Sequence, residues 1–277
     1  MKKSIFYLFL GTLFACQGQK DEVKSPSGYQ LSQPVKMRMR EALLEISGIA
    51  FTPKDELFAV QDEDGQIFRV AMDDGRILYS SKFGKKGDYE DIAVTGNQVI
   101  VLRSDGVLQT FESSLVGKII PKVIQQKELL PAGEFESLFA KDDSIYVLCK
   151  ECAKDKGKKY TSGYVFSLNE KGKLAPAGNF KINIEEICEI AEKPKLHFRP
   201  SALAQHPKTK DWYVLSSVNR LLVVTDPAWK VREVYPLDPV LFLQPEGIAF
   251  DSKADLFISN EGDEISNGSV FKFAYQQ

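Results

Sequence analysis

The chain has 277 residues, 43% of them hydrophobic, which is enough to bury a sizeable core in one or two domains. Its 36 basic and 38 acidic residues give a formal charge of -2, and outside the lysine-rich stretch at 153–160 no long block of one sign occurs. This composition excludes a disordered or fibrous chain. It also argues against a protein that binds nucleic acid.

The N-terminus has the pattern of an exported protein. Lys2 and Lys3 precede an apolar run at 5–15 that is too short to cross a bilayer as a helix, as in a secretory signal peptide. The run ends in LFAC, which resembles the lipobox of bacterial lipoproteins. We expect a signal peptide at 1–15, a lipid on Cys16 and a flexible tether at 16–33, with simple secretion as the alternative. A lipid on Cys16 would anchor the protein to the outer membrane, on its periplasmic or its surface face.

From residue 45 onward, one phrase recurs along the chain. It reads EISGIAF at 45–51, DYEDIAV at 88–94, EFESLFA at 134–140, RPSALAQ at 199–205 and QPEGIAF at 244–250. The third positions are separated by 43, 46, 65 and 45 residues. A period near 45 residues fits a propeller blade of four strands, and it also fits some repeats of two helices.

The residues between successive copies of the phrase favour strands over helices. After EISGIAF come three short runs rich in strand-forming residues, at 57–64, 66–74 and 76–83, with a glycine near each joint. The last copy leaves room for only three strands, so we expect residues 34–41, which alternate apolar and basic side chains, to supply the fourth. The sequence thus predicts an all-β fold, a five-bladed β-propeller over 34–277 that is closed by its N-terminal strand.

A six-bladed propeller is the alternative fold, because one step is 65 residues long. A hidden blade would need about twice the normal period, whereas the surplus is only about 20 residues. The polar stretch at 151–163 and a short helix within 183–195 account for it.

Six sequence blocks resemble one family of bacterial proteins. The blocks are EISGIAF, LFAVQDEDGQIF, DYEDIAV, HFRPSALAQHP, YVLSSVNRLLVV and PEGIAFDSKADLFISNEG. Together they are similar to the SdiA-regulated, or YjiK-like, family of envelope propellers, over about residues 40–275. The resemblance implies a five-bladed propeller in the cell envelope and implies little about activity.

The recurring phrase places polar residues at two columns of positions. One column holds Glu45, Asp88, Glu134, Arg199 and Gln244, and the other holds Ser47, Glu90, Glu136, Ser201 and Glu246. If both columns face the channel, their six carboxylates converge in a partly desolvated place, where like charges raise one another's pKa. Arg199 or a hard cation such as Ca²⁺ would compensate them. The acidic residues Glu45, Asp88, Glu90, Glu134, Glu136 and Glu246 are therefore candidate metal ligands, with hydrated channel residues as the alternative.

A second polar cluster follows the next strand of each unit, where propellers build their binding face. We select as candidate ligand-binding residues, together with Arg199, the following: Asp62, Glu63, Arg103, Lys150, Ser217, Asn260 and Glu261. Ordinary turn chemistry, in which these polar residues only stabilise the turns, is the alternative.

Besides Cys16 the chain has Cys149, Cys152 and Cys188, and export favours a disulfide. The pairs Cys149–Cys152 and Cys152–Cys188 both remain open, and either leaves one cysteine over.

These residues favour a membrane-anchored extracytoplasmic binding module, with an undefined protein, glycan or small-molecule ligand and a calcium-type cation in the channel mouth. We expect a monomer. The alternative is a metal-assisted hydrolase of the esterase, lactonase or phosphatase type, with Glu90 or Glu136 as the base. The sequence carries no G-x-S-x-G, H-E-x-x-H or P-loop motif, and whether the protein is an enzyme stays open.

Overall fold

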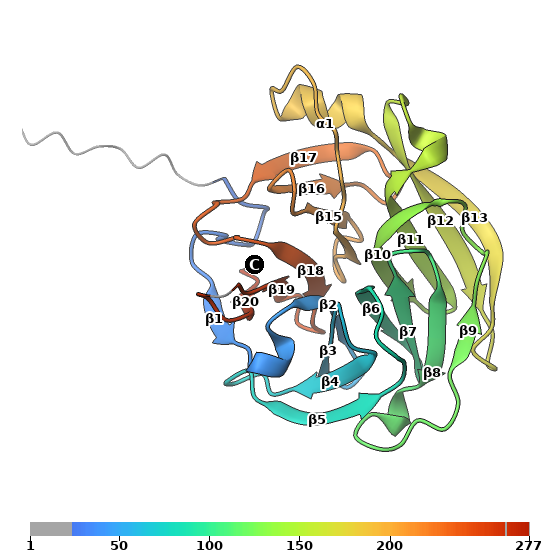
Figure 1. Cartoon of the computed structure of the whole chain (residues 1–277). Helices are drawn as coiled ribbons and strands as arrows, with labels where there is room; N and C mark the ends of the chain where they lie inside the picture. Colours follow the sequence, from blue (N-terminus) through green and yellow to red (C-terminus); the bar gives the residue numbers. More distant parts are fainter. Residues whose placement is uncertain (1–23, 264, 277) are drawn as a thin grey trace, which may run out of the picture.

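The computed structural model describes residues 24–263 and 265–276, and the predicted signal peptide and Cys16 lie outside them. Five antiparallel sheets of four strands surround a central channel (Figure 1). The protein is thus the predicted five-bladed β-propeller, and the six-bladed alternative is excluded. Among the described residues, no helix is long and apolar enough to cross a membrane.

Each blade runs from an inner strand at the channel to an outer strand at the rim. Blade 1 contains β2 (Ile46–Phe51), β3 (Leu57–Gln61), β4 (Gln66–Val70) and β5 (Ile77–Lys82). Blade 2 contains β6 (Tyr89–Thr95), β7 (Gln98–Arg103), β8 (Leu108–Glu112) and β9 (Ile124–Gln126). Blade 3 contains β10 (Gly133–Lys141), β11 (Ser144–Cys152), β12 (Tyr160–Leu168) and β13 (Leu174–Asn183). Blade 4 contains β14 (Ala202–Gln205), β15 (Trp212–Ser216), β16 (Leu221–Thr225) and β17 (Val231–Pro236).

Blade 5 joins the two ends of the chain. It contains β18 (Pro245–Phe250), β19 (Leu256–Asn260), β20 (Ser269–Phe273) and, outermost, β1 (Val35–Arg38). The register pairs Met37 with Val270, and Met37 is buried while its neighbours are exposed. The predicted closing strand is therefore confirmed: Met37 packs inward, although Val35 at the start of the strand is exposed, and each of the five described blades has four strands.

The extra residues of the long third repeat lie in blade 3 and in the connection that follows it. Its strands have nine or ten residues, whereas those of the other blades have three to seven. The predicted short helix is α1 (Ile184–Ile190), which begins where the Asn183 side chain accepts the Glu185 backbone N–H.

The hydrophobic core lies between the blades. Side chains alternate along an inner strand, so Ile49 packs with blade 5 and the next residue, Ala50, packs with blade 2. The channel is consequently bounded by the edges of the inner strands. All inner strands run in the same direction, which gives the channel two different ends. Their first residues form one end, here called the acidic mouth, and their last residues form the other.

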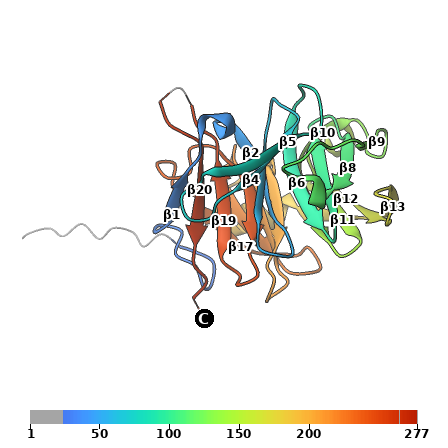
Figure 2. The same ribbon diagram turned by 90° about the horizontal axis from the view of Figure 1, so that it is seen from below.

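The first and last described segments of the chain lie at the end of the channel away from the acidic mouth. Figure 2 shows the C-terminus at this end, and the backbone N–H of Gln276 donates to Gly28 there. Tyr29 packs beside Phe250 and donates through its hydroxyl to the carbonyl of Ala254, 2.6 Å away.

Candidate binding site at the channel mouth

Three glutamates stand at the same irregularity in three inner strands. In blade 2, Tyr89 pairs with Arg103 and Asp91 pairs with Leu102, so Glu90 between them has no cross-strand partner. The pairing skips Glu136 in blade 3 and Glu246 in blade 5 in the same way. Such β-bulges re-aim a side chain. They bring the three carboxyl groups close enough to influence one another across the mouth.

Lys150 supplies the ammonium of this group. Glu134 pairs with Glu151 and Phe135 with Cys149, which leaves Lys150 unpaired at a bulge in the second strand of blade 3. Its Nζ donates to the carboxylates of Glu134, at 3.0 Å, and of Glu136. Their negative charges and hydrogen bonds outweigh burial and raise the pKa of Lys150, so it stays protonated.

Desolvation dominates the electrostatics of the glutamates. Burial, followed by the charges of Glu136 and Asp88, raises the pKa of Glu90 to about 9. Burial and the charge of Glu136 raise the pKa of Glu246 to about 8. Burial raises the pKa of Glu136 itself to about 7, although Lys150 opposes the shift. The acidic mouth therefore carries bound protons near neutral pH.

The acidic arc continues through blades 5 and 1. Burial and the charge of Asp62 raise the pKa of Glu261 to about 7. Burial and the charge of Glu45 raise the pKa of Asp62 to about 6. The Nε2 of Gln244 donates to Glu261 at 2.6 Å and holds that carboxyl group at the mouth.

The other predicted residues differ in position. Ser217 hydrogen-bonds to Glu246 within the mouth. Arg199 pairs with Glu151 at 2.5 Å, so Lys150, rather than Arg199, is the cation beside Glu136. At the periphery, exposed Glu63 pairs with Lys86, and Arg103 pairs with Asp105 at 2.7 Å. The carboxylate of Asp88 accepts the hydroxyl of Ser104.

The serines of the second column are structural. The Ser47 hydroxyl donates to the Tyr89 carbonyl of blade 2 at 2.8 Å, and the Ser201 hydroxyl donates to the Pro245 carbonyl of blade 5 at 3.2 Å. Both side chains are buried. They link neighbouring inner strands, so of this column only the glutamates contribute to the mouth.

Asp91 is a buried acid that the sequence analysis did not select. It is 3% exposed, and its two carboxylate oxygens accept the N–H groups of Ile92, at 2.8 Å, and of Leu138 in blade 3, at 2.7 Å. Burial raises its pKa. The available signal was its place in the phrase, because the other four copies have Gly, Ser or Ala there. A Cβ on Gly48 would lie 2.5 Å from the Cα of Asp91, so the neighbouring strand passes too close for a side chain.

The mouth can hold a cation only after rearrangement. Among residues 24–263 and 265–276, the one group of three acidic, histidine or cysteine side chains with ligand atoms within 4.8 Å of one another is Cys149, Cys152 and Asp155, and the two sulfur atoms of this group are joined in a disulfide. The mouth carboxyl groups are thus spread more widely than the coordination shell of one ion, and Lys150 stands among them. A divalent cation would have to displace that ammonium.

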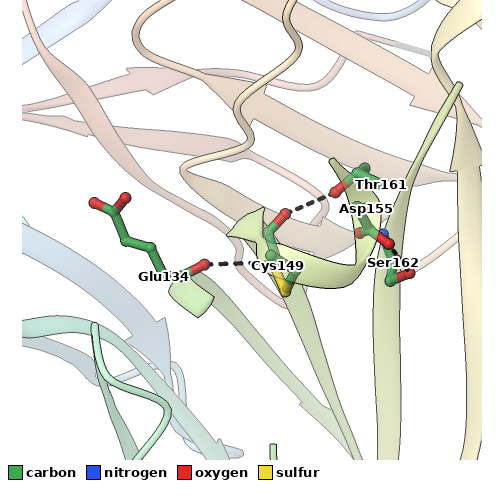
Figure 3. Close-up of a disulfide and its surroundings, with 6 residues drawn as sticks. Glu134, Cys149, Asp155, Thr161 and Ser162 are labelled. Carbon is green, nitrogen blue, oxygen red and sulfur yellow. Dashed lines mark hydrogen bonds between the residues drawn. A yellow bond between two sulfur atoms is a disulfide. The ribbon is translucent and has the colours of Figure 1, made fainter. Parts of the chain in front are cut away.

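Of the two disulfides that the sequence left open, Cys149–Cys152 and Cys152–Cys188, the structure contains the first. Cys149 and Cys152 make a disulfide, while Cys188 is free. Both cysteines belong to the last four residues of β11, and Figure 3 shows the surroundings of the bridge at Cys149. The Thr161 hydroxyl donates to the Cys149 carbonyl at 2.7 Å, and Asp155 accepts the hydroxyl and the backbone N–H of Ser162, each at 2.8 Å. The bridge encloses Lys150 and so closes a loop around the ammonium-bearing residue.

Comparison with known proteins shows the fold. No family model matches the chain, and no curated protein matches it in sequence. A glutaminyl cyclase from Myxococcus xanthus superposes with a TM-score of 0.58 at 12% identity, over 88% of this chain and 96% of its own. A PQQ-bound aldose sugar dehydrogenase from Streptomyces coelicolor gives 0.53 at 11% identity, over 88% and 99%. A luciferin-regenerating enzyme gives 0.52 at 10% identity, over 87% and 95%. At such identities the β-propeller fold alone is shared, and any function must be argued from the site.

Proposed function

We propose that the protein is an extracytoplasmic binding module, anchored to the outer membrane by a lipid on Cys16, whose acidic mouth binds a cation. The observation that carries the proposal is the set of three glutamates with raised pKa at the mouth, one of which, Glu136, accepts a hydrogen bond from the ammonium of Lys150. Ca²⁺ is the simplest such cation, because it takes carboxylate oxygens in flexible geometry. The cationic group of a protein, glycan or small-molecule ligand could take the same place.

The protons of the mouth explain how a cation would bind. Carboxyl groups that remain protonated near neutral pH do so because their negative charges are desolvated and close together. A bound cation removes that repulsion and replaces the protons. Lys150 already neutralises part of the charge, so it competes with any added cation for Glu134 and Glu136.

The position of the first described residues supports the membrane anchor. Residues 24–34 join the ring at the end opposite the acidic mouth, where Tyr29 packs beside Phe250. An anchor on Cys16 would therefore leave the acidic mouth facing away from the membrane. The resemblance to the SdiA-regulated family supports the same envelope location.

Calorimetric titration of the purified protein with CaCl₂ tests the proposal. We expect saturable binding that becomes at least several-fold tighter in Lys150→Gln, because the competing ammonium is gone. Lys193→Gln is the matched control, since Lys193 is an exposed lysine in the turn after α1. Absence of saturable binding in both the wild type and Lys150→Gln would exclude Ca²⁺. The same titration with methylammonium then decides whether the mouth binds an organic cation.

One observation favours a metal-assisted hydrolase as the second candidate. The pKa of Glu136, about 7, is the value at which a general base works best near neutral pH. In this case the protein would hydrolyse p-nitrophenyl acetate or p-nitrophenyl phosphate in the presence of Ca²⁺, and Glu136→Gln would abolish the reaction. Activity that persists in Glu136→Gln would reject Glu136 as the base.

A further inference from the structure

The end of the channel opposite the acidic mouth contains an apolar cavity of about 290 Å³. All five inner strands contribute their last residues to its wall, including Phe51, Val94, Leu203 and Phe250. The recurring phrase leaves the space open, because its sixth position is alanine in four of the five copies. The cavity is thus a product of the repeat, as the mouth is, but has the opposite chemistry.

Of the described residues that line this cavity, two lysines are the charged ones. The Nζ of Lys141 in blade 3 donates to the Gln205 side chain of blade 4 at 3.1 Å, and Gln205 donates in turn to the backbone carbonyl of Lys210 at 3.0 Å. The Lys210 ammonium bonds to the Pro207 carbonyl. Among the described residues, neither ammonium has a carboxylate within salt-bridge distance. One glutamine thus connects two lysines at the rim of an apolar space.

We propose that this cavity binds a small amphiphilic monocarboxylate, with its apolar chain between the inner strands and its carboxylate between Lys141 and Lys210. The wall excludes a polar ligand, because a buried polar group without a partner is costly. The two lysines select an anionic head over a neutral one. The site lies at the other end of the channel from the acidic mouth, and the inference does not depend on the function proposed for that mouth.

The volume sets the size of the ligand. An apolar cavity of about 150 Å³ holds one benzene molecule, so about 290 Å³ accommodates roughly ten to twelve non-hydrogen atoms. Octanoate, which has about ten non-hydrogen atoms, fits this range, and 1-octanol is its uncharged counterpart. Comparison of the two separates recognition of the chain from recognition of the carboxylate.

Isothermal titration of the purified protein with octanoate and with 1-octanol tests the proposal. We expect one octanoate per chain, bound at least ten-fold more tightly than octanol. The double variant Lys141→Gln/Lys210→Gln should lose this preference, while Ala204→Phe, which fills the cavity, should bind neither compound. Lys208→Gln is the matched control, because Lys208 lies in the same turn as Lys210 but places its ammonium over the Tyr275 ring.

Three results would overturn the proposal. They are no saturable octanoate binding, equal affinity for octanoate and octanol, and an effect of Lys208→Gln as large as that of the double variant. If Ala204→Phe does not fold, the double lysine variant alone tests the proposal. This variant should fold, because both substituted side chains are exposed.

Discussion

Replacement of Glu90 by glutamine tests whether the mouth holds protons. Burial and neighbouring charges raise the pKa of Glu90 from 4.5 to about 9, so the folded protein binds this proton more tightly than the unfolded chain does. The stabilising contribution is complete below pH 4.5, and it is lost as the pH rises to about 9. The free energy of unfolding should consequently fall with rising pH across the neutral range.

The magnitude follows from proton linkage. One proton of difference between the folded and unfolded states changes the free energy of unfolding by about 1.4 kcal/mol per pH unit. Glu90 is not fully buried, so solvent screening limits the rise of its pKa and narrows the pH range over which this slope applies; averaged over the neutral range, we expect about 1 kcal/mol per pH unit from Glu90. Glutamine keeps the shape of a protonated glutamate and cannot ionise, so Glu90→Gln should flatten the dependence by this amount. Between pH 6 and pH 8 the variant should gain roughly 2 kcal/mol over the wild type.

Urea unfolding at pH 6, 7 and 8, at constant ionic strength, measures this difference. Glu170→Gln is the control, because Glu170 is exposed in the turn that follows β12, and it should leave the dependence unchanged. Parallel curves for the wild type and Glu90→Gln would refute the reasoning. They would mean that Glu90 is ionised in the folded protein and that the mouth is better solvated than its geometry indicates.

Three further predictions concern the frame that holds the site. Asp91→Ala leaves two buried N–H groups unpaired and should lower the free energy of unfolding by about 2 to 6 kcal/mol, as measured by urea unfolding at pH 7. The control, Asp73→Ala, changes an exposed residue and should leave the free energy of unfolding unchanged. A loss below about 1 kcal/mol for Asp91→Ala would contradict its role between the blades. Met37→Ala removes a buried side chain of the closing strand and should lower the free energy of unfolding by about 2 kcal/mol or more. Lys36→Ala, at an exposed position of the same strand, should change it little. Equal losses in the same assay would show that β1 does not stabilise the ring. The double variant Cys149→Ala/Cys152→Ala opens a short disulfide loop, so its free energy of unfolding should be about 2 kcal/mol lower than that of Cys188→Ala. Equal unfolding midpoints for the two variants would contradict this prediction.

The architecture could be predicted because it follows from periodicity. The spacing of the recurring phrase gave the blade count, and the alternation of Met37 with its basic neighbours indicated the closing strand. Both signals depend only on regular strands, in which successive side chains alternate between two sides.

The geometry of the site could not be predicted because it depends on irregular positions. Glu90 and Lys150 reach the mouth through β-bulges, where the alternation is broken. From alternation alone, Arg199 was as good a partner for the glutamates as Lys150. The cysteine pair also required coordinates, since three cysteines allow more than one bridge.

If a cation binds in the acidic mouth, it replaces protons there. Calorimetric titration of Lys150→Gln with CaCl₂ at pH 7, in buffers of different ionisation enthalpy, counts the protons released per bound ion. With Glu90 and Glu246 protonated at this pH, the proposal predicts the release of about one to two protons for each ion bound. Saturable binding without proton release, or no binding of either Ca²⁺ or methylammonium, would contradict it.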